Sequence, residues 1–506
     1  MIEQHATLTE KFLKKGFWLY LFSFIIAPLG YIIKIIISGE LRVEEVGILY
    51  GIISLITLLS GFSDFGMTES LKKFIPQYVI EKRYDKVKTI LFLTIIIQLF
   101  TSFLIFLLFY FGAEFIANTY FKDSVAIEVL KIFSIFFIGS NISQVISTFF
   151  LAIQDTFLNK ITEFIRMIAL LSFTIGIFVL NKSSIINYSY AWIFGLVIGI
   201  IFTYIFFHFK YYKKYLKGVK LSIDKELFKI VFKYALLVLL STQASTILSQ
   251  IDMQMIIYLL GNKDAGYYTN YLSIISIPIM IIGPIFMFLF PVFSEMYSKG
   301  EIEKIKLVKN IFVKIFLAIG IAFNTMFFVL GPAIAYTLFG EKFIDSGVIL
   351  RYSVLLFIFN FLLQINGNIL ASIGKIKERL KIVSIGIIFN FITNIILIKL
   401  IGVYGAALAT SFGWVLIWFL QEKVLGNEYK TNLDFKFIFN NLSIMTIVGT
   451  IIYFFSGNLV NISRVDSLIY LFIIGLIYFG LFVIINYKEF RFFILEIKRL
   501  RNDKHS

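Results

Sequence analysis

Charged and amide side chains inside long apolar segments are the residues of this chain with the clearest chemical potential. Asp252 lies between two glutamines in SQIDMQMIIYLLG (249–261), and Lys34 lies in the apolar segment 16–38. A charge at the centre of a lipid bilayer costs about 2.5–3.5 kcal/mol on insertion scales, so such residues are rare unless they have a function. Asp252 and Lys34 are therefore candidates for a gate or a polar cavity, if these segments cross a membrane.

Amide side chains recur on several other apolar segments. An amide both donates and accepts hydrogen bonds, which suits a hydroxylated ligand but equally links one helix to another. Both interpretations stay open for these cavity candidates: Gln243, Gln250, Gln254, Asn141, Gln144, Asn360, Gln364 and Asn368. On a helix the three glutamines fall within about 40° of one another, and Asp252 lies on the opposite side.

Arg166 lies about 13 Å into segment 158–180, counting 1.5 Å per residue. Its planar guanidinium is suited to a pyrophosphate, although Glu163, three residues earlier, is an alternative partner.

Pro278 and Pro284 are candidate hinges, because proline removes a backbone donor and bends a helix. Asp64 is a third gating candidate, with helix termination at Gly66 as the alternative.

The composition indicates an integral membrane protein. Of the 506 residues, 59% are hydrophobic and only 15% are charged, against roughly 25% charged in a soluble protein. The chain has no cysteine, which excludes disulfides and thiolate metal sites. Its three histidines are far apart and form no HExxH motif, so neither a metal site nor a cofactor is expected.

Apolar windows long enough to cross the hydrocarbon core occur fourteen times. They must be helices, because every peptide group inside lipid needs an internal partner. The first window is followed by no cleavage site and is expected to be retained. The windows are 16–38, 44–66, 88–112, 126–152, 158–180, 186–209, 231–259, 266–292, 310–337, 348–373, 382–400, 402–422, 438–456 and 466–487.

Basic residues predict the orientation of these spans. With both termini in the cytoplasm, 37 of the 47 Lys and Arg residues fall on the cytoplasmic side and only nine outside. The net charge of +16 is then mostly a consequence of topology, and no nucleic-acid partner is expected. The predicted location is the cell membrane.

The two halves of the chain repeat at a spacing of 219 residues. Val46-Gly47 matches Ala265-Gly266, Asn141 matches Asn360, and Leu151-Ala152 matches Leu370-Ala371. Several matches in one register are not easily chance. The same spacing places Lys34 opposite Met253, beside Asp252, so these two charges are predicted partners across the halves. A structural ion pair, or snorkelling of each side chain to the interface, is the alternative.

The repeat predicts an all-α polytopic membrane protein with 14 transmembrane helices, arranged as two homologous six-helix lobes plus two extra C-terminal helices. A repeat of six spans is parallel, with substrate expected between the halves. The predicted domains are an N-terminal lobe (1–209), a basic amphipathic linker (210–230), a C-terminal lobe (231–423), and accessory helices 13 and 14 with a basic tail (424–506). The linker is expected on the anionic inner leaflet, in contact with membrane lipids.

Besides this layout, three segments of the sequence resemble a known family. Residues 39–78 (GELRVEEVGILYGIISLITLLSGFSDFGMTESLKKFIPQY) look like the first helical hairpin of the polysaccharide (O-antigen and oligosaccharide) flippases. These proteins belong to the multidrug/oligosaccharidyl-lipid/polysaccharide exporter superfamily. Residues 250–274 resemble the family's seventh helix and 400–416 its twelfth.

The resemblance implies a flippase that moves a polyprenyl-linked oligosaccharide to the outer leaflet by alternating access, for surface polysaccharide biosynthesis. Polysaccharide-assembly enzymes are its implied partners. A multidrug or small-solute antiporter of the same superfamily is the main alternative, and a membrane polysaccharide polymerase or ligase is the second. No GxxxxGK[S/T] phosphate loop occurs, so ATP hydrolysis by that route is not expected. The energy would come from an ion gradient of H+ or Na+, from the membrane potential or from consumption of the product outside, and the sequence does not choose among these.

Overall fold

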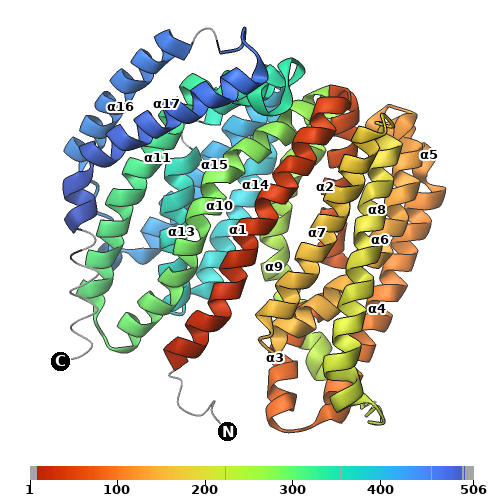
Figure 1. The fold of residues 1–506 in the computed structure, drawn as a ribbon. Helices are drawn as coiled ribbons and strands as arrows, with labels where there is room; N and C mark the ends of the chain where they lie inside the picture. Colours follow the sequence, from red (N-terminus) through yellow and green to blue (C-terminus); the bar gives the residue numbers. More distant parts are fainter. Residues whose placement is uncertain (1–7, 223, 354–355, 457–458, 493–494, 496–506) are drawn as a thin grey trace. The chain divides into compact units, whose positions relative to one another are not determined.

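The computed structural model describes residues 8–222, 224–353, 356–456, 459–492 and 495, and every regular element within these ranges is a helix (Figure 1). The expected all-helical class is therefore confirmed. The chain divides into two compact units, Met1–Gly266 and Tyr267–Ser506. The ends of the chain, including most of the predicted basic tail, lie outside the described residues.

The first unit is built from long helices joined by short turns. Its elements are α1 (Leu8–Glu40), α2 (Val43–Ser63), α3 (Met67–Ile80), α4 (Tyr84–Phe111), α5 (Ala113–Ile116), η1 (Ala117–Phe121), α6 (Val125–Ala152), α7 (Thr156–Val179), α8 (Ile185–Phe207), η2 (His208–Leu216) and α9 (Lys225–Leu259). The first turn of α10 (Asn262–Ser298) completes the unit.

The second unit continues α10 and ends with the two accessory helices. Its further elements are α11 (Ile302–Phe339), η3 (Glu341–Phe343), α12 (Ile344–Ile349), η4 (Leu350–Ser353), α13 (Leu356–Ser372), α14 (Ile376–Ile401), α15 (Val403–Leu425), η5 (Asn427–Tyr429), α16 (Phe435–Ser456) and α17 (Arg464–Ile485). Helices α16 and α17 both pack on α11.

Eleven helices within the described residues are long and apolar enough to cross a membrane, or twelve if the bent pair Glu341–Ser353 and Phe357–Ser372 is one span. Each of the predicted windows lies largely on a helix. Helices α1 and α9, at the first and seventh windows, are not among the eleven. The many membrane helices are thus confirmed, whereas the count of fourteen stays a prediction.

Helix boundaries recur at the spacing of the sequence repeat. Helices α1 and α9 end at Glu40 and Leu259, α2 and α10 begin at Val43 and Asn262, and α6 and α12 begin at Val125 and Ile344. Each pair is 219 positions apart. The repeat therefore holds for local structure as well as for residue identity.

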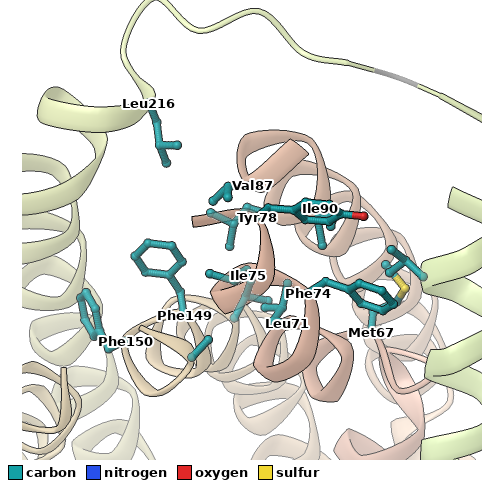
Figure 2. Close-up of a cluster of buried hydrophobic side chains, with 14 of the residues drawn as sticks. Met67, Leu71, Phe74, Ile75, Tyr78, Val87, Ile90, Phe149, Phe150 and Leu216 are labelled. Carbon is teal, nitrogen blue, oxygen red and sulfur yellow. The ribbon is translucent and has the colours of Figure 1, made fainter. Parts of the chain in front are cut away.

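A buried hydrophobic cluster in the first unit holds α3 against its neighbours (Figure 2). Met67, Leu71, Phe74, Ile75 and Tyr78 recur on one face of α3, as in an amphipathic surface helix. Residues of α4, α6, α7 and α9 also belong to the cluster, and so does Leu216 of the predicted linker. The start of the linker is thus packed against helices.

Asp155, between α6 and α7, makes a second set of contacts with the start of the linker. Its carboxylate accepts hydrogen bonds from the Leu158 backbone nitrogen at 3.1 Å and from Lys210 Nζ at 2.6 Å and the Tyr211 hydroxyl. Burial alone would raise the pKa of Asp155, but the bonds from Lys210, Tyr211 and Leu158 together outweigh it and hold this pKa below its ordinary value. The charged form of Asp155 is therefore the one that stabilises the fold.

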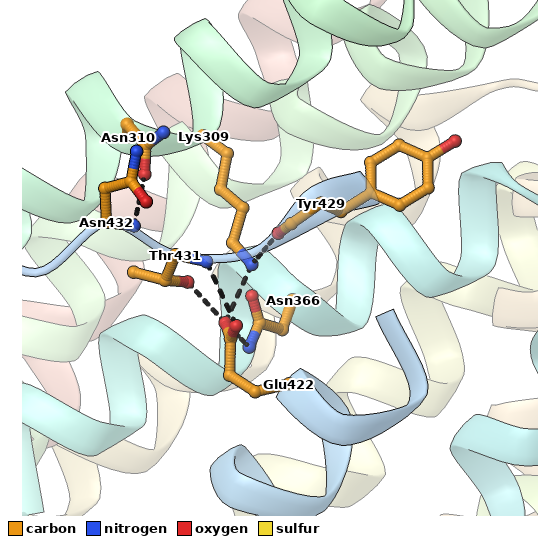
Figure 3. A network of polar contacts seen from close by, with 7 residues as sticks. All are labelled: Lys309, Asn310, Asn366, Glu422, Tyr429, Thr431 and Asn432. Carbon is orange, nitrogen blue, oxygen red and sulfur yellow. Dashed lines mark hydrogen bonds and ion pairs between the residues drawn. The ribbon is translucent and has the colours of Figure 1, made fainter. Parts of the chain in front are cut away.

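In the second unit, Lys309 of α11 is buried, and its positive charge is compensated by protein groups (Figure 3). Its Nζ donates to Glu422 Oε1 and to the Tyr429 carbonyl, both at 2.7 Å. Glu422 also accepts from Asn366 Nδ2 at 2.8 Å, from the Thr431 backbone nitrogen at 3.1 Å and from the Thr431 hydroxyl. This network joins α11, α13, α15 and the segment before α16 without needing a ligand.

Replacing Asp155 with alanine removes both the α7 cap and the link to η2, so we expect a loss of about 1–3 kcal/mol in stability at pH 7. Because the pKa of Asp155 is lowered in the folded state, its contribution is complete above the ordinary aspartate pKa and is lost as pH falls below about 4. Thermal unfolding of the purified protein at pH 7 and near pH 3.5 measures this difference.

Asp224→Ala is the matched control, because Asp224 caps α9 through the Glu226 backbone nitrogen and has no bond to another element among the described residues. It should cost about 1 kcal/mol. An equal loss in the two variants at pH 7 would contradict the role given to the Lys210 and Tyr211 contacts.

Candidate functional site

A polar cavity of about 450 Å³ lies inside the first unit, between α2, α6, α7 and α8. This volume is within the range of small-ligand sites. The polar lining consists of hydroxyls, amides and charged groups, namely Thr57, Ser60, Ser140, Asn141, Ser143, Gln144, Ser147, Thr162, Glu163, Arg166 and Thr203. Phe133, Phe136 and Trp192 provide its aromatic wall. The structure thus brings together three predicted residues, Asn141, Gln144 and Arg166.

Arg166 is positioned by the packing of α7 against α8. A Cβ at Gly199 would lie 2.9 Å from Arg166 Cβ, and a Cβ at Gly195 would lie 2.9 Å from Leu170 Cβ. The two glycines of the GxxxG sequence on α8 therefore let the helices approach closely. The stem of Arg166 is held against α8, and the residue lines the cavity.

The guanidinium of Arg166 forms no hydrogen bond or ion pair with any residue in the described part of the chain. Glu163, the alternative partner considered from the sequence, instead pairs with Lys160 at 2.7 Å. Glu163 still interacts electrostatically with Arg166 across the cavity, but its ion pair is with Lys160, so the guanidinium donors of Arg166 are not used by a carboxylate. A charge in such surroundings requires compensation from water or from an anionic ligand.

Two further cavity residues carry polar atoms without a partner among the described residues. Asn141 is 1% exposed; its Nδ2 donates to Ser102 Oγ at 2.9 Å, while its Oδ1 accepts nothing. The indole nitrogen of Trp192 is also buried and unpartnered. The cavity lining therefore includes an unpartnered donor and an unpartnered acceptor beside an aromatic surface, together with the cation of Arg166.

This arrangement suits a ligand with one anionic group and several hydroxyls. Arg166 provides the planar, multidentate donor that phosphate favours. Amides and hydroxyls accept and donate to hydroxyl groups, and aromatic faces bury the apolar side of a ring. Within the described residues, no group of three or more His, Asp or Glu side chains is arranged to hold a metal ion.

Lys34 and Asp252 are both buried, with 9% and 4% exposed. Lys34 Nζ lies 4.2 Å from the centre of the Tyr50 ring, so α2 supplies a cation–π contact to this lysine. The predicted pairing of Lys34 with Asp252 stays a prediction.

The three glutamines of α9 have different surroundings. Gln243 packs against Gly61 of α2, with its Oε1 buried and unpartnered among the described residues. Gln250 donates to Ser249 Oγ at 3.2 Å. Gln254 donates to Ser54 Oγ at 2.9 Å and to the Gly51 carbonyl at 3.3 Å, and the Tyr120 hydroxyl lies 2.8 Å from its Oε1. The observed bonds of Gln254 thus link helices.

Gly47 and Gly266 lie at a close contact between α2 and α10. A Cβ at Gly47 would lie 1.9 Å from the Asn262 carbonyl oxygen, and a Cβ at Gly266 would lie 2.2 Å from the Val43 carbonyl oxygen. The side chain of Asn262 also donates to the Phe121 carbonyl at 2.7 Å. Two glycines that match in the sequence repeat therefore pack against each other where α2 and α10 begin.

The predicted amides of α13 lie in the second unit, separate from this cavity. Asn360 is buried, with 7% exposed, and Asn368 Nδ2 donates to the Gln364 carbonyl at 2.9 Å, one turn back along the helix. Pro278 and Pro284 both lie within α10, and their role as hinges stays a prediction.

Asp64 connects α2 to α3. Its carboxylate accepts from the Gly66 backbone nitrogen at 2.9 Å and from the Thr68 backbone nitrogen at 2.7 Å. Gly66 has φ +80°, a conformation that favours glycine. These are the bonds of a helix terminus and turn, and a gating role for Asp64 stays a prediction.

Sequence reasoning missed the hydroxyls of α6 and the indole of Trp192. Ser140, Ser143, Gln144 and Ser147 have the i, i+3, i+4, i+7 spacing of one helix face. This spacing places the four polar residues on one helix face, and it could have predicted that they line a common cavity. Nothing in the sequence indicated that Trp192 borders the same cavity.

The fold defines a polytopic helical membrane protein with a polar cavity inside its first unit. Comparison with known proteins places it further. The family model described as polysaccharide biosynthesis protein matches residues 12–297, more than half of the chain. The chain belongs to this family, as the resemblance in the sequence implied.

The relatives agree in fold. An uncharacterized membrane protein of Methanocaldococcus jannaschii is 28% identical, over 94% of this chain and 95% of its own. The structure of the lipid II flippase MurJ in an inward closed conformation has a TM-score of 0.72 and 17% identity, covering 93% of this chain and 99% of its own. An inward-facing multidrug resistance MATE family transporter of the MOP superfamily has a TM-score of 0.64 and 15% identity, covering 85% and 99%.

Gly47→Ala should destabilise the protein by about 1–3 kcal/mol, because the new methyl group cannot coexist with the Asn262 carbonyl unless α2 and α10 separate. Gly266→Ala should have a similar effect. Thermal unfolding of the purified variants measures both losses.

Gly176→Ala on α7 is the control, since a Cβ there meets no atom within 4 Å. Alanine at an open helical position should be neutral or stabilising by up to about 1 kcal/mol. Wild-type stability in Gly47→Ala would show that the contact between α2 and α10 is not tightly packed.

Proposed function

We propose that this protein is a flippase that moves a lipid-linked oligosaccharide, of the polyprenyl-phosphate type, from the cytoplasmic to the outer leaflet by alternating access. Membership of the polysaccharide biosynthesis family supports this assignment. The observation that carries it is Arg166, which has no hydrogen bond or ion pair among the described residues and lies in a cavity that otherwise offers amides, hydroxyls and an aromatic wall. In this proposal Arg166 binds the phosphate, and Asn141, Gln144 and Trp192 contact the sugar.

The position of the cavity fits loading from the cytoplasmic side. Apart from Phe133, Phe136 and Trp192, its lining residues lie in the second halves of α2, α6 and α8 and in the first half of α7. In the proposed orientation, with both termini cytoplasmic in the cell membrane, these halves lie nearer the cytoplasm. Arg166 is then about 15 Å from the start of α7, a depth at which a headgroup has left the membrane surface.

The alternative, a cation-coupled multidrug antiporter, fits the cavity less well. A cationic solute would be repelled by Arg166, and the carboxylate of Glu163 is already paired with Lys160. A polymerase or ligase is a weaker alternative, because the relatives named above with an activity are transporters.

The two-lobe architecture with fourteen spans remains part of this proposal. The recurrence of helix boundaries at 219 residues supports it, and so does the contact of the equivalent Gly47 and Gly266. In this proposal Lys34 and Asp252 act together at the gate, and Pro278 and Pro284 let α10 bend. An H+ or Na+ gradient supplies the energy, and polysaccharide-assembly enzymes consume the product.

Arg166→Gln should reduce transport of a fluorescent lipid-linked oligosaccharide about 10- to 100-fold in reconstituted vesicles. A hydrogen bond to a charged group contributes about 1.5–3 kcal/mol, which corresponds to that range. Arg166→Lys should retain part of the activity, because it keeps the charge but not the planar fork. The fluorescent lipid must cross without a change in mass, which separates a flippase from an enzyme.

Lys182→Gln serves as the control, since Lys182 lies exposed in the turn between α7 and α8 and does not line the cavity. Wild-type transport in Arg166→Gln would overturn the assigned role of Arg166. Export of a cationic dye by the wild type, with no movement of the lipid-linked oligosaccharide, would favour the antiporter.

A further inference from the structure

A second cavity, of about 620 Å³, lies within the second unit between α11, α13 and α16, beside Arg351 of η4. Its polar lining residues are Asn324, Thr325, Arg351, Thr446, Thr450 and Tyr453. At the repeat spacing of 219, Asn324 and Arg351 correspond to Ile105 and Ile132. Asn324 and Arg351 therefore have no polar equivalent in the first half of the chain.

Asn324 gives the strongest sign that the cavity holds a ligand. It is only 6% exposed, and neither its Nδ2 nor its Oδ1 has a hydrogen-bond partner among the described residues. A buried amide is normally satisfied by protein, water or ligand. Asn324 lines the cavity and lacks a hydrogen-bond partner among the described residues, so water or a ligand that reaches its amide can supply a donor and an acceptor.

Arg351 adds a positive charge at one end of the cavity. Its Nε donates to the Phe328 carbonyl at 3.2 Å, and its guanidinium lies 5.9 Å from the centre of the Phe328 ring. Phe328 follows Asn324 by one helical turn, about 6 Å. No Asp or Glu is found among the described residues that line the cavity, so the cation and the amide together favour an anionic, hydroxylated group.

The accessory helix α16 forms one wall of the cavity, and the cavity is open at the surface along this helix. A Cβ at Gly449 would lie 2.8 Å from Thr325 Cγ2, so α16 crosses α11 closely at this point. Thr446 and Thr450, near the crossing, are exposed, as is Tyr453. Only 17% of the apolar window of α16 is buried. A molecule from the surrounding lipid can therefore enter from the side.

We infer that this cavity binds one anionic glycerophospholipid whose headgroup carries hydroxyls. Arg351 binds its phosphate, an anion that arginine recognises through several donors. Asn324 Nδ2 donates to an ester carbonyl and Asn324 Oδ1 accepts from a hydroxyl. The acyl chains extend into the bilayer along the exposed side of α16. This site is separate from the proposed transport site, and its test does not depend on transport.

Native mass spectrometry of the purified full chain, titrated with phosphatidylglycerol or with phosphatidylcholine of the same acyl chains, tests the inference. The wild type should retain one phosphatidylglycerol in preference to phosphatidylcholine. Arg351→Gln and Asn324→Leu should each reduce that retention at least five-fold. Thr446→Trp, a change at an exposed position, should block entry even if Asn324→Leu fails to fold.

Arg464→Gln is the matched control. Arg464 also donates to backbone carbonyls, those of Thr337 at 3.2 Å and Leu338 at 2.8 Å, but it does not line the cavity. It should retain phosphatidylglycerol at the wild-type level. Equal retention in wild type and Arg351→Gln, or equal binding of the two phospholipids, overturns the inference. Preferential retention of a polyprenyl phosphate would do so as well, because it would assign the cavity to the substrate.

Discussion

The structure depends on one constraint, which is that a charge inside apolar helices must be compensated. Lys309 and Arg166 meet this constraint in opposite ways. Lys309 is enclosed by Glu422 and the Tyr429 carbonyl, and its network joins helices of the second unit. Arg166 has no such partner among the described residues and lines a polar cavity instead. The first arrangement stabilises a fold, whereas the second leaves a cation available for an anion.

Close helix packing is what makes the second arrangement possible. Gly195 and Gly199 bring α8 against α7, so that the stem of Arg166 is fixed while its head stays in the cavity. The same use of glycine recurs at Gly47 and Gly266, where backbone meets backbone. In one case glycine positions a ligand-binding side chain, and in the other it closes the contact between two helices. Both depend on the absence of a Cβ atom.

The polar residues of the spans thus separate into two groups. Gln254, Asn366 and Asn368 have protein partners and link or stabilise helices. Arg166, Trp192 and Asn324 have polar atoms that no described residue satisfies, and each lines a cavity. Satisfied amides link helices. An unsatisfied group that also lines a cavity is a candidate contact for another molecule, whereas Gln243, which is unsatisfied but packed against Gly61, is not.

The sequence by itself determined the class of protein and the order of its helices. The length of an apolar segment can be read locally, and such a segment must be helical inside a bilayer because its peptide groups need internal partners. The spacing of 219 residues predicted which helices correspond. Local pattern also marked Asn141, Gln144 and Arg166 as unusual. It did not reveal α3, which is too short to span and packs through one amphipathic face.

Only the tertiary structure decided which of the marked residues share a site. Glu163 forms an ion pair with Lys160 rather than with Arg166, and Gln254 donates a hydrogen bond to Ser54 of α2. Trp192 of α8 lines the same cavity as the polar residues of α6. Each outcome depends on which helix face meets which neighbour. Sequence periodicity defines a face but not its partner, because helix packing depends on side-chain shape across residues far apart in the chain.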